Sequence, residues 1–172
     1  SSVIGHNTDI NGFYKAIETL NFIVNNKKVL ILGAGGVVPS IIFALKKMHV
    51  SQISITNRTK KKANDMKTQF NYITVVDWGD LPEFDVVINA TSLGLNNESI
   101  NLDFSKVGKN KLFYDVIYNP AETSFLREGK KLGNLIENGK MMFVYQASEA
   151  FYLWHGLKPK IDNKIIELLS ND

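Results

Sequence analysis

The chain has 172 residues, of which 44% are hydrophobic and 22% are charged, values typical of one globular domain with a substantial core. It contains no cysteine, which excludes a disulfide framework and a thiolate metal site, and no other metal site is expected. No run approaches the roughly 18 apolar residues that span a membrane and no signal peptide is visible, so we expect a cytoplasmic protein without a membrane partner. A nucleic-acid partner is not expected from the net charge of +3, because acidic residues are interspersed and no aromatic residues alternate with the lysines.

The first predicted element is an amphipathic helix over residues 9–21, where apolar side chains recur at helical spacing. Thr8 or Asp9 could accept hydrogen bonds from the first free N–H groups of this helix, which is a capping role. The alternative is that Asp9 takes part in chemistry, and this stretch alone leaves both interpretations open.

Strands and helices alternate along the rest of the chain. Apolar runs predict strands in KKVLILGAGG, SQISITN, YITVV, DVVINA, KLFYDVIY and NLIEN. Periodic segments predict helices in VVPSIIFALKKM, RTKKKANDMKTQF, TSFLREGKKLG, MMFVYQASEAFYLWHG and IDNKIIELLS. Thr59 is the expected cap of the second of these helices, and Gly156 the expected stop of the fourth. The alternation indicates an α/β fold, a doubly wound parallel sheet with helices on both faces.

A glycine cluster lies at the first strand-to-helix junction. The stretch LGAGGVVPS supplies Gly33, Gly35 and Gly36 where the backbone must turn tightly and can approach a ligand closely. The helix that follows offers free N–H groups and a partial positive charge to a pyrophosphate. Val38 occupies the third glycine position of the G-x-G-x-x-G pattern, so a plain tight turn remains an alternative.

The end of the next strand carries no acidic residue. An NAD-binding domain usually has Asp or Glu about 20 residues beyond the glycines, whereas this chain has Asn57, Arg58 and Thr59. A guanidinium binds a 2′-phosphate as a planar fork, and Lys62 lies one helical turn further on. The pattern favours NADP over NAD, and the alternative is a helix cap with scattered surface cations.

Small polar residues follow two later strands. In INATSLGL, we expect Asn89, Thr91, Ser92 and Gly94 to line the ligand crevice at the carboxyl end of a parallel strand, although a simple polar loop would have the same sequence. Tyr118 in YDVIYNP is expected at another strand end. Gln146 lies on the long helix that follows Gly139, and structural roles remain the alternative for both Tyr118 and Gln146.

Taken in order, the motifs GHNTD…GF, LGAGG, NRT, INATSLG, YDVIYNP and NG…M…QASEAF..WHG resemble those of the shikimate dehydrogenase family. The resemblance runs along essentially the whole chain. It implies an NADP-dependent oxidoreductase that reduces 3-dehydroshikimate to shikimate in aromatic amino-acid (chorismate) biosynthesis. A quinate/shikimate dehydrogenase and a non-catalytic NADP-binding module remain alternatives.

The resemblance also implies roles for individual residues. Asp9 is implied as a catalytic and substrate-binding residue, and the other implied substrate-binding residues are Asn7, Thr8, Tyr118 and Gln146. The residues expected to bind the cofactor are Gly33, Ala34, Gly35, Gly36, Val37, Asn57, Arg58, Thr59, Lys62, Thr91, Ser92, Val116 and Gly139. The chain departs from the family pattern at Lys62, where arginine is usual, at Val116, where methionine is frequent, and at Pro39, where a polar or basic residue is usual.

The expected organisation is a connector helix within residues 1–24, an NADP-binding Rossmann domain over residues 25–156 and a C-terminal helix within residues 157–172. The resemblance implies that a substrate domain, with substrate-binding serines and a catalytic lysine, precedes this segment in the intact enzyme. Without that domain we expect the chain to be inactive. We also expect the two terminal helices to pack together and a homodimer to cover their apolar surface.

Overall fold

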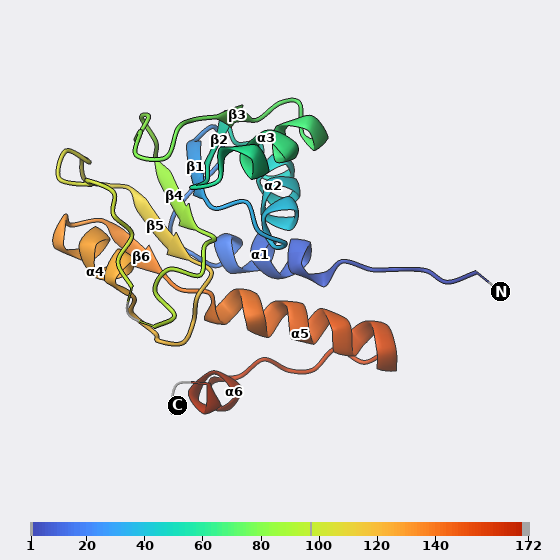
Figure 1. Ribbon diagram of the computed structural model, residues 1–172. Helices are drawn as coiled ribbons and strands as arrows, with labels where there is room; N and C mark the ends of the chain where they lie inside the picture. Colours follow the sequence, from blue (N-terminus) through green and yellow to red (C-terminus); the bar gives the residue numbers. More distant parts are fainter. Residues whose placement is uncertain (1, 97, 170–172) are drawn as a thin grey trace.

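A computed structural model of the protein describes residues 2–96 and 98–169 (Figure 1). The strands within these residues are β1 (Lys28–Leu32), β2 (Gln52–Thr56), β3 (Thr74–Val75), β4 (Val86–Asn89), β5 (Leu112–Asp115) and β6 (Leu135–Glu137). The helices are α1 (Thr8–Glu18), α2 (Val38–Lys47), α3 (Lys60–Gln69), α4 (Ser124–Lys131), α5 (Lys140–His155) and α6 (Asn163–Leu168).

The strands of the described residues form one sheet in the order β3-β2-β1-β4-β5-β6, and every pairing is parallel. The chain builds outward from β1 in one direction and then returns to add β4 on the other side of β1. Such a reversal opens a crevice outside the carboxyl ends of the central strands, which is where ligands of doubly wound sheets bind. The predicted fold class is therefore confirmed.

Both faces of the sheet are buried, as the continuous apolar strands require. In β1, Val29 and Ile31 belong to a core cluster with α1, α2, α3 and α5, whereas Leu30 and Leu32 belong to a second cluster with α4. Side chains of a strand point alternately to opposite faces, so β1 contributes to two separate cores. Phe104, from the loop before β5, completes the second core.

Helix α1 begins one residue earlier than predicted, and the expected caps were wrong. Asn7 is the N-cap, and its side-chain oxygen accepts hydrogen bonds from the backbone N–H groups of Asp9 and Ile10 at 3.1 and 3.4 Å. The nitrogen of the same amide donates to the buried Ser40 hydroxyl on α2 at 3.0 Å. Capping of α1 is thus already provided by Asn7, which leaves the Asp9 carboxylate available for another role.

Two other sequence-based expectations, the capping bond of Thr59 and the position of Tyr118, differ from the structure. Thr59 does occupy the N-cap position of α3, but its side chain makes no capping hydrogen bond. Strand β5 ends at Asp115, so Tyr118 lies in the loop beyond the strand. Gly156 ends α5 in the left-handed conformation with a φ of 70°, as predicted, because glycine has no Cβ to clash there. The predicted end of the last helix, residue 170, falls outside the described residues.

The terminal helices do not pack on each other as expected, because α5 lies between α1 and α6 (Figure 1). Gly12 lets α1 approach α5: a Cβ added at Gly12 would lie only 2.8 Å from both the Gln146 Cβ and the Met142 carbonyl oxygen. This close approach fixes the position of the first turn of α1, which carries Asp9, relative to α5. Among the described helices, none has the length and apolar character needed to cross a bilayer.

Candidate functional site

Two cavities lie at the carboxyl ends of the strands. The first, which we call the glycine-turn cavity, has a volume of about 380 Å³ and is lined by Gly33, Ala34, Gly35, Asn57, Arg58, Thr59, Lys62, Trp78, Ala90, Thr91, Ser92 and Leu93. The second, the Asp9 cavity, has a volume of about 360 Å³ and is lined by Asp9, Val37, Val116, Tyr118, Gly139, Met142, Phe143 and Gln146. Both volumes fall in the range of small-molecule sites.

The turn between β1 and α2 forms the floor of the first cavity. Gly33 has a φ of +110°, and a Cβ at this position would lie 2.7 Å from the Ala90 carbonyl oxygen, so no other residue fits without strain. By contrast, no described atom lies within 4 Å of a Cβ built on Gly36. The turn therefore packs tightly against Ala90, directly after β4, on one side and leaves open space on the other, where a ligand can approach the backbone.

The N-terminus of α2 faces this turn without a side-chain cap. Val37 is the N-cap residue and makes no side-chain capping bond, and the first turn of α2 carries no acidic residue. Free N–H groups and the helix dipole make such an end favourable for an anion. Val38, at the third glycine position, is fully buried in the first core cluster, so the missing glycine does not affect the open side of the turn.

The loop after β2 forms a basic rim on the first cavity. The side-chain amide of Asn57 donates to the Thr59 carbonyl oxygen at 2.8 Å and fixes the turn that presents Arg58. Arg58 and Lys62 are exposed, and no aspartate or glutamate is among the described residues that line this cavity. The rim therefore attracts an anionic group and carries no carboxylate of the kind that binds a ribose 2′-hydroxyl.

Asn89 supports the loop after β4 from below and does not line the crevice, contrary to expectation. It is fully buried, and its oxygen accepts hydrogen bonds from the Thr91 N–H at 3.0 Å and the Thr91 hydroxyl at 2.7 Å. Its nitrogen donates to the Leu93 carbonyl at 3.1 Å. Gly94 is buried as well and lines neither cavity. The buried Asn89 amide therefore fixes the backbone of the loop that carries Thr91 and Ser92.

A buried carboxylate links this loop to the second cavity. Asp115 accepts hydrogen bonds from the Asn89 amide at 3.0 Å, the Ile117 N–H at 3.0 Å and the Thr123 hydroxyl at 2.6 Å. Burial raises the pKa of the Asp115 carboxyl, while the three hydrogen bonds act in the opposite direction. Sequence reasoning missed this network, although a polar residue at the end of each of two buried strands was a signal that could have indicated it.

Three elements bring the residues of the Asp9 cavity together. Asp9 comes from the first turn of α1, Tyr118 from the loop after β5 and Gln146 from α5. The Tyr118 ring stacks on Phe143 with a centroid distance of 5.0 Å, which orients the phenol. The cavity therefore presents a carboxylate, a phenol and an amide beside the apolar surface of Met142 and Phe143.

Gly139, which lines the Asp9 cavity, lies directly against the backbone of Val116 after β5. A Cβ at this position would overlap the Val116 carbonyl group, and the Gly139 N–H donates to the Ile117 carbonyl oxygen at 3.1 Å. Only glycine lets the start of α5 approach the strand end this closely. The close approach at Gly139 keeps Val116 at the cavity wall.

Replacing Gly139 with Ala is expected to lower the free energy of unfolding by at least about 2 kcal/mol, because the added methyl group forces α5 away from β5. Gly108→Ala is the matched control, since no described atom lies within 4 Å of a Cβ there; it should change stability by less than about 0.5 kcal/mol. Thermal unfolding of both variants measures the difference, and equal melting temperatures would contradict the tight packing of this junction.

The sequence matches the family model described as "Shikimate / quinate 5-dehydrogenase" over residues 16–116, which is more than half of the chain. The chain belongs to the shikimate/quinate 5-dehydrogenase family. A curated relative from Pelagibacter ubique, named shikimate dehydrogenase (NADP(+)), is 52% identical over 170 residues, covering 98% of this chain and 64% of the relative. This alignment with the relative covers the segments that line both cavities.

Solved structures of similar proteins extend the comparison. Shikimate 5-dehydrogenase from Thermus thermophilus in complex with NADP(H) and shikimate is 30% identical, with a TM-score of 0.84, and the match covers 96% of this chain and 62% of that one. Quinate dehydrogenase from Corynebacterium glutamicum in complex with NAD is 28% identical, with a TM-score of 0.84, covering 96% and 61%. The chain thus spans somewhat less than two thirds of the length of these family members.

Most residues that the family resemblance implicated lie in one of the two cavities. The glycine-turn cavity collects Gly33, Ala34, Gly35, Asn57, Arg58, Thr59, Lys62, Thr91 and Ser92. The Asp9 cavity collects Asp9, Val37, Val116, Tyr118, Gly139 and Gln146. Asn7, Thr8 and Gly36 are not among the described lining residues of either cavity. Thr8 still touches the site, because its hydroxyl lies 3.4 Å from the Gln146 side-chain oxygen.

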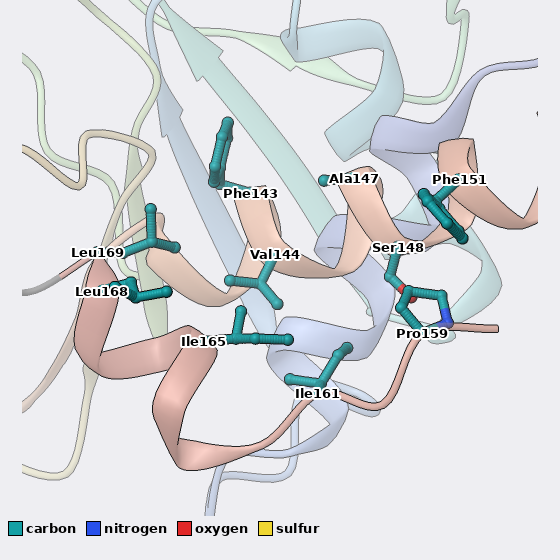
Figure 2. Close-up of a pocket in the computed structure, with 10 residues that line it drawn as sticks. All are labelled: Phe143, Val144, Ala147, Ser148, Phe151, Pro159, Ile161, Ile165, Leu168 and Leu169. Atoms are coloured by element: carbon teal, nitrogen blue, oxygen red, sulfur yellow. The ribbon is translucent and has the colours of Figure 1, made fainter.

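An apolar groove between α5 and α6 adjoins the Asp9 cavity, with which it shares Phe143. It has a volume of about 350 Å³, and Val144, Phe151, Ile161 and Ile165 are among its lining residues (Figure 2). Its lining side chains are almost entirely apolar, so it lacks the polar groups that would orient a substrate. Within residues 2–96 and 98–169, no group of three or more acidic or histidine side chains could hold a metal ion.

Proposed function

We propose that this chain binds NADP(H) and forms part of the active site of an NADP-dependent shikimate dehydrogenase, which reduces 3-dehydroshikimate to shikimate in aromatic amino-acid biosynthesis. The observation that carries the proposal is the rim of the glycine-turn cavity. Arg58 and Lys62 lie at the end of β2, and no carboxylate is among the described lining residues. A 2′-phosphate gains charge-assisted hydrogen bonds at such a rim.

The residues present fit a dinucleotide with a 2′-phosphate. The open side of the Gly33–Gly36 turn and the uncapped start of α2 would hold the pyrophosphate, since both offer backbone N–H groups and space. Asn57, Arg58, Thr59 and Lys62 would hold the 2′-phosphate, and Thr91 and Ser92 a ribose. Val116 and Gly139 would flank the nicotinamide in the Asp9 cavity. When bound, NADPH supplies the hydride of the reaction.

The polar groups of the Asp9 cavity would bind and orient the substrate ring. The Gln146 amide and the Tyr118 phenol can hydrogen-bond to ring hydroxyls, and the stacking of Tyr118 on Phe143 reduces the motion of the phenol. The Asp9 carboxylate would orient a neighbouring ammonium group and stabilise its positive charge while that group holds the proton destined for the alkoxide.

That ammonium group is proposed to come from outside these residues. No lysine is among the described residues that line the Asp9 cavity. The family members that match are longer than this chain, which spans 64% of the Pelagibacter ubique relative. We propose that a substrate domain supplies the lysine and the second wall of the site, and that the domain borders lie near residues 24 and 156 of this sequence.

The cofactor assignment predicts that NADPH binds more tightly than NADH, by about tenfold or more, because a hydrogen bond to a charged group contributes roughly 1.5–3 kcal/mol. Arg58→Ala should remove most of this preference and leave NADH affinity nearly unchanged. Lys61→Ala is the control, since Lys61 is exposed on α3 and is not among the lining residues. Calorimetric titration of the three proteins with both nucleotides gives the comparison. Equal affinity of the unmodified chain for NADPH and NADH would contradict the assignment.

The substrate choice within the family is part of the proposal. Quinate dehydrogenase is the name of one structural relative, so quinate is the principal competing substrate. Competition between shikimate and quinate, measured on a protein that contains both domains, distinguishes the two activities. A non-catalytic NADP-binding module is the remaining alternative, and it is favoured if no protein containing these residues turns over either compound.

A homodimer and a cytoplasmic location complete the proposal. Large apolar side chains are exposed around the end of α5, namely Phe151, Tyr152, Leu153, Trp154 and Leu157. Exposed apolar patches of several hundred Å² mark surfaces that another polypeptide covers. Light scattering over a range of concentrations tests association through this surface, and a monomer at all concentrations argues against the dimer.

A further inference from the structure

We propose that Trp78 forms the adenine-binding wall of the cofactor site, with the indole ring stacking on the adenine of NADP(H). This inference rests on the proposed function and assigns one specific contact within it. Sequence reasoning gave Trp78 no role, because it lies in a loop outside every motif that resembles the family pattern.

The position of Trp78 in the sheet order supports this assignment. Trp78 lies in the turn that follows β3, the edge strand next to β2, and it lines the same cavity as Arg58 and Thr59. The Asp9 cavity is lined by Val116 and Tyr118, which follow β5, and β5 lies on the other side of β1 from β2 and β3. A dinucleotide extended from the Asp9 cavity across the glycine turn to Arg58 would therefore have its adenosine end at Trp78.

The indole ring is held in place before any ligand binds. Trp78 is half-buried and packs against the second core cluster. The loop that carries it is fixed by a hydrogen bond from the Val76 N–H to the Ile55 carbonyl oxygen at 3.0 Å. An ion pair of 2.5 Å between Asp77 and Lys60 ties the loop to the first turn of α3. A fixed ring loses little conformational entropy on binding, which favours affinity.

The chemistry of the cavity also points to Trp78. It is the aromatic residue among the described lining residues, whose other apolar members are Ala34, Ala90 and Leu93. Indole offers a flat apolar face to a planar purine, whereas the small aliphatic side chains do not. Removing a base-stacking aromatic residue commonly weakens binding by about tenfold to a hundredfold.

The binding test uses adenosine 2′,5′-bisphosphate, which carries adenine and a 2′-phosphate but no nicotinamide, beside NADPH. Trp78→Ala should weaken both by about tenfold or more, and Trp78→Phe should retain affinity within about threefold, because phenylalanine keeps a stacking face. Trp154→Phe is the matched control, since Trp154 is 78% exposed on α5 and lies outside the cavity. Unchanged affinity of Trp78→Ala for both ligands overturns the inference.

A fluorescence measurement tests the same contact with the indole intact. The chain has two tryptophans, so Trp154→Phe leaves Trp78 as the sole indole emitter, and Trp78→Phe leaves Trp154. Adenosine 2′,5′-bisphosphate should quench the emission of Trp78 at saturation and leave that of Trp154 unchanged. If adenosine 2′,5′-bisphosphate saturates the protein without changing Trp78 emission, the inference about Trp78 is overturned and the proposed function is not affected. Absence of NADPH binding to the unmodified chain overturns the proposed function, and this inference with it.

Discussion

Assayed by itself, the 172-residue chain is expected to bind NADPH without measurably oxidising it in the presence of 3-dehydroshikimate. Asp9, Tyr118 and Gln146 supply one polar wall of the Asp9 cavity, and no lysine is among its described lining residues. Losing orientation of the reactants can raise a barrier by about 7–11 kcal/mol. Losing a general acid commonly removes a further 10²–10⁴-fold, so turnover should fall below detection by a wide margin.

The assay follows NADPH absorbance with two proteins. One is the chain alone, and the other is a chimera in which these residues replace the matching segment of the Pelagibacter ubique relative, which is 52% identical over that segment. The chimera should be active, and the unmodified relative serves as its control. Substantial turnover by the chain alone would show that the Asp9 cavity already holds every catalytic group.

In the chimera, Asp9→Asn is expected to lower the turnover rate by about 10²–10⁴-fold, because the amide cannot stabilise the charge of the proton carrier. NADPH affinity should change by less than about threefold, because the groups proposed to bind its 2′-phosphate and pyrophosphate line the glycine-turn cavity and not the Asp9 cavity. Stability should change by less than about 1 kcal/mol, because Asp9 contributes to α1 only through the helix dipole. These separate readouts distinguish a catalytic role from a structural one.

Asn7→Ala serves as the matched comparison, because it should lower stability more than turnover, the reverse of Asp9→Asn. Asn7 caps α1 and bonds to Ser40, so its loss should lower stability by about 0.5–2 kcal/mol. Because Asn7 does not line the Asp9 cavity, the turnover rate of the chimera should fall far less than in Asp9→Asn. A near-normal rate for Asp9→Asn would return Asp9 to the role of a residue at a helix terminus.

The order of strands and helices could be predicted from sequence because it depends on local pattern. The central strands are short apolar runs, and helices such as α1 and α2 have a periodic apolar face that packs on the core. The glycine turn and the basic residues after β2 were equally visible, since motif residues adjacent in sequence stay adjacent in the structure. These features needed no knowledge of long-range packing.

The errors in prediction concern choices that distant residues decide. Sequence offered Thr8 or Asp9 as caps of α1, but Ser40 on α2 fixes the Asn7 amide in the capping orientation. Asn89 was expected in the crevice, yet the buried Asp115 and the turn at Thr91 hold it beneath the loop. In both cases a side-chain amide joins segments that are more than 25 residues apart, and no local pattern encodes such a partner.

Close approaches of the backbone were the other hidden feature. Gly12 and Gly139 look like ordinary helix and loop glycines in the sequence, but each removes a Cβ that would collide with a neighbouring element. Together they set how α1 and α5 meet the end of β5 and thereby shape the Asp9 cavity. Trp78 joins the first cavity for a similar reason, because the parallel pairing of β3 with β2 brings its turn beside Arg58.

The central claim is that the glycine-turn cavity and the Asp9 cavity are the two halves of one NADP(H) site. A crystal structure of the chain grown with NADP⁺ tests this claim most directly. We expect the 2′-phosphate beside Arg58 and Lys62, and the nicotinamide ring beside Val116 and Gly139. A dinucleotide bound outside these two cavities, or one whose 2′-phosphate lies away from Arg58, would contradict the account.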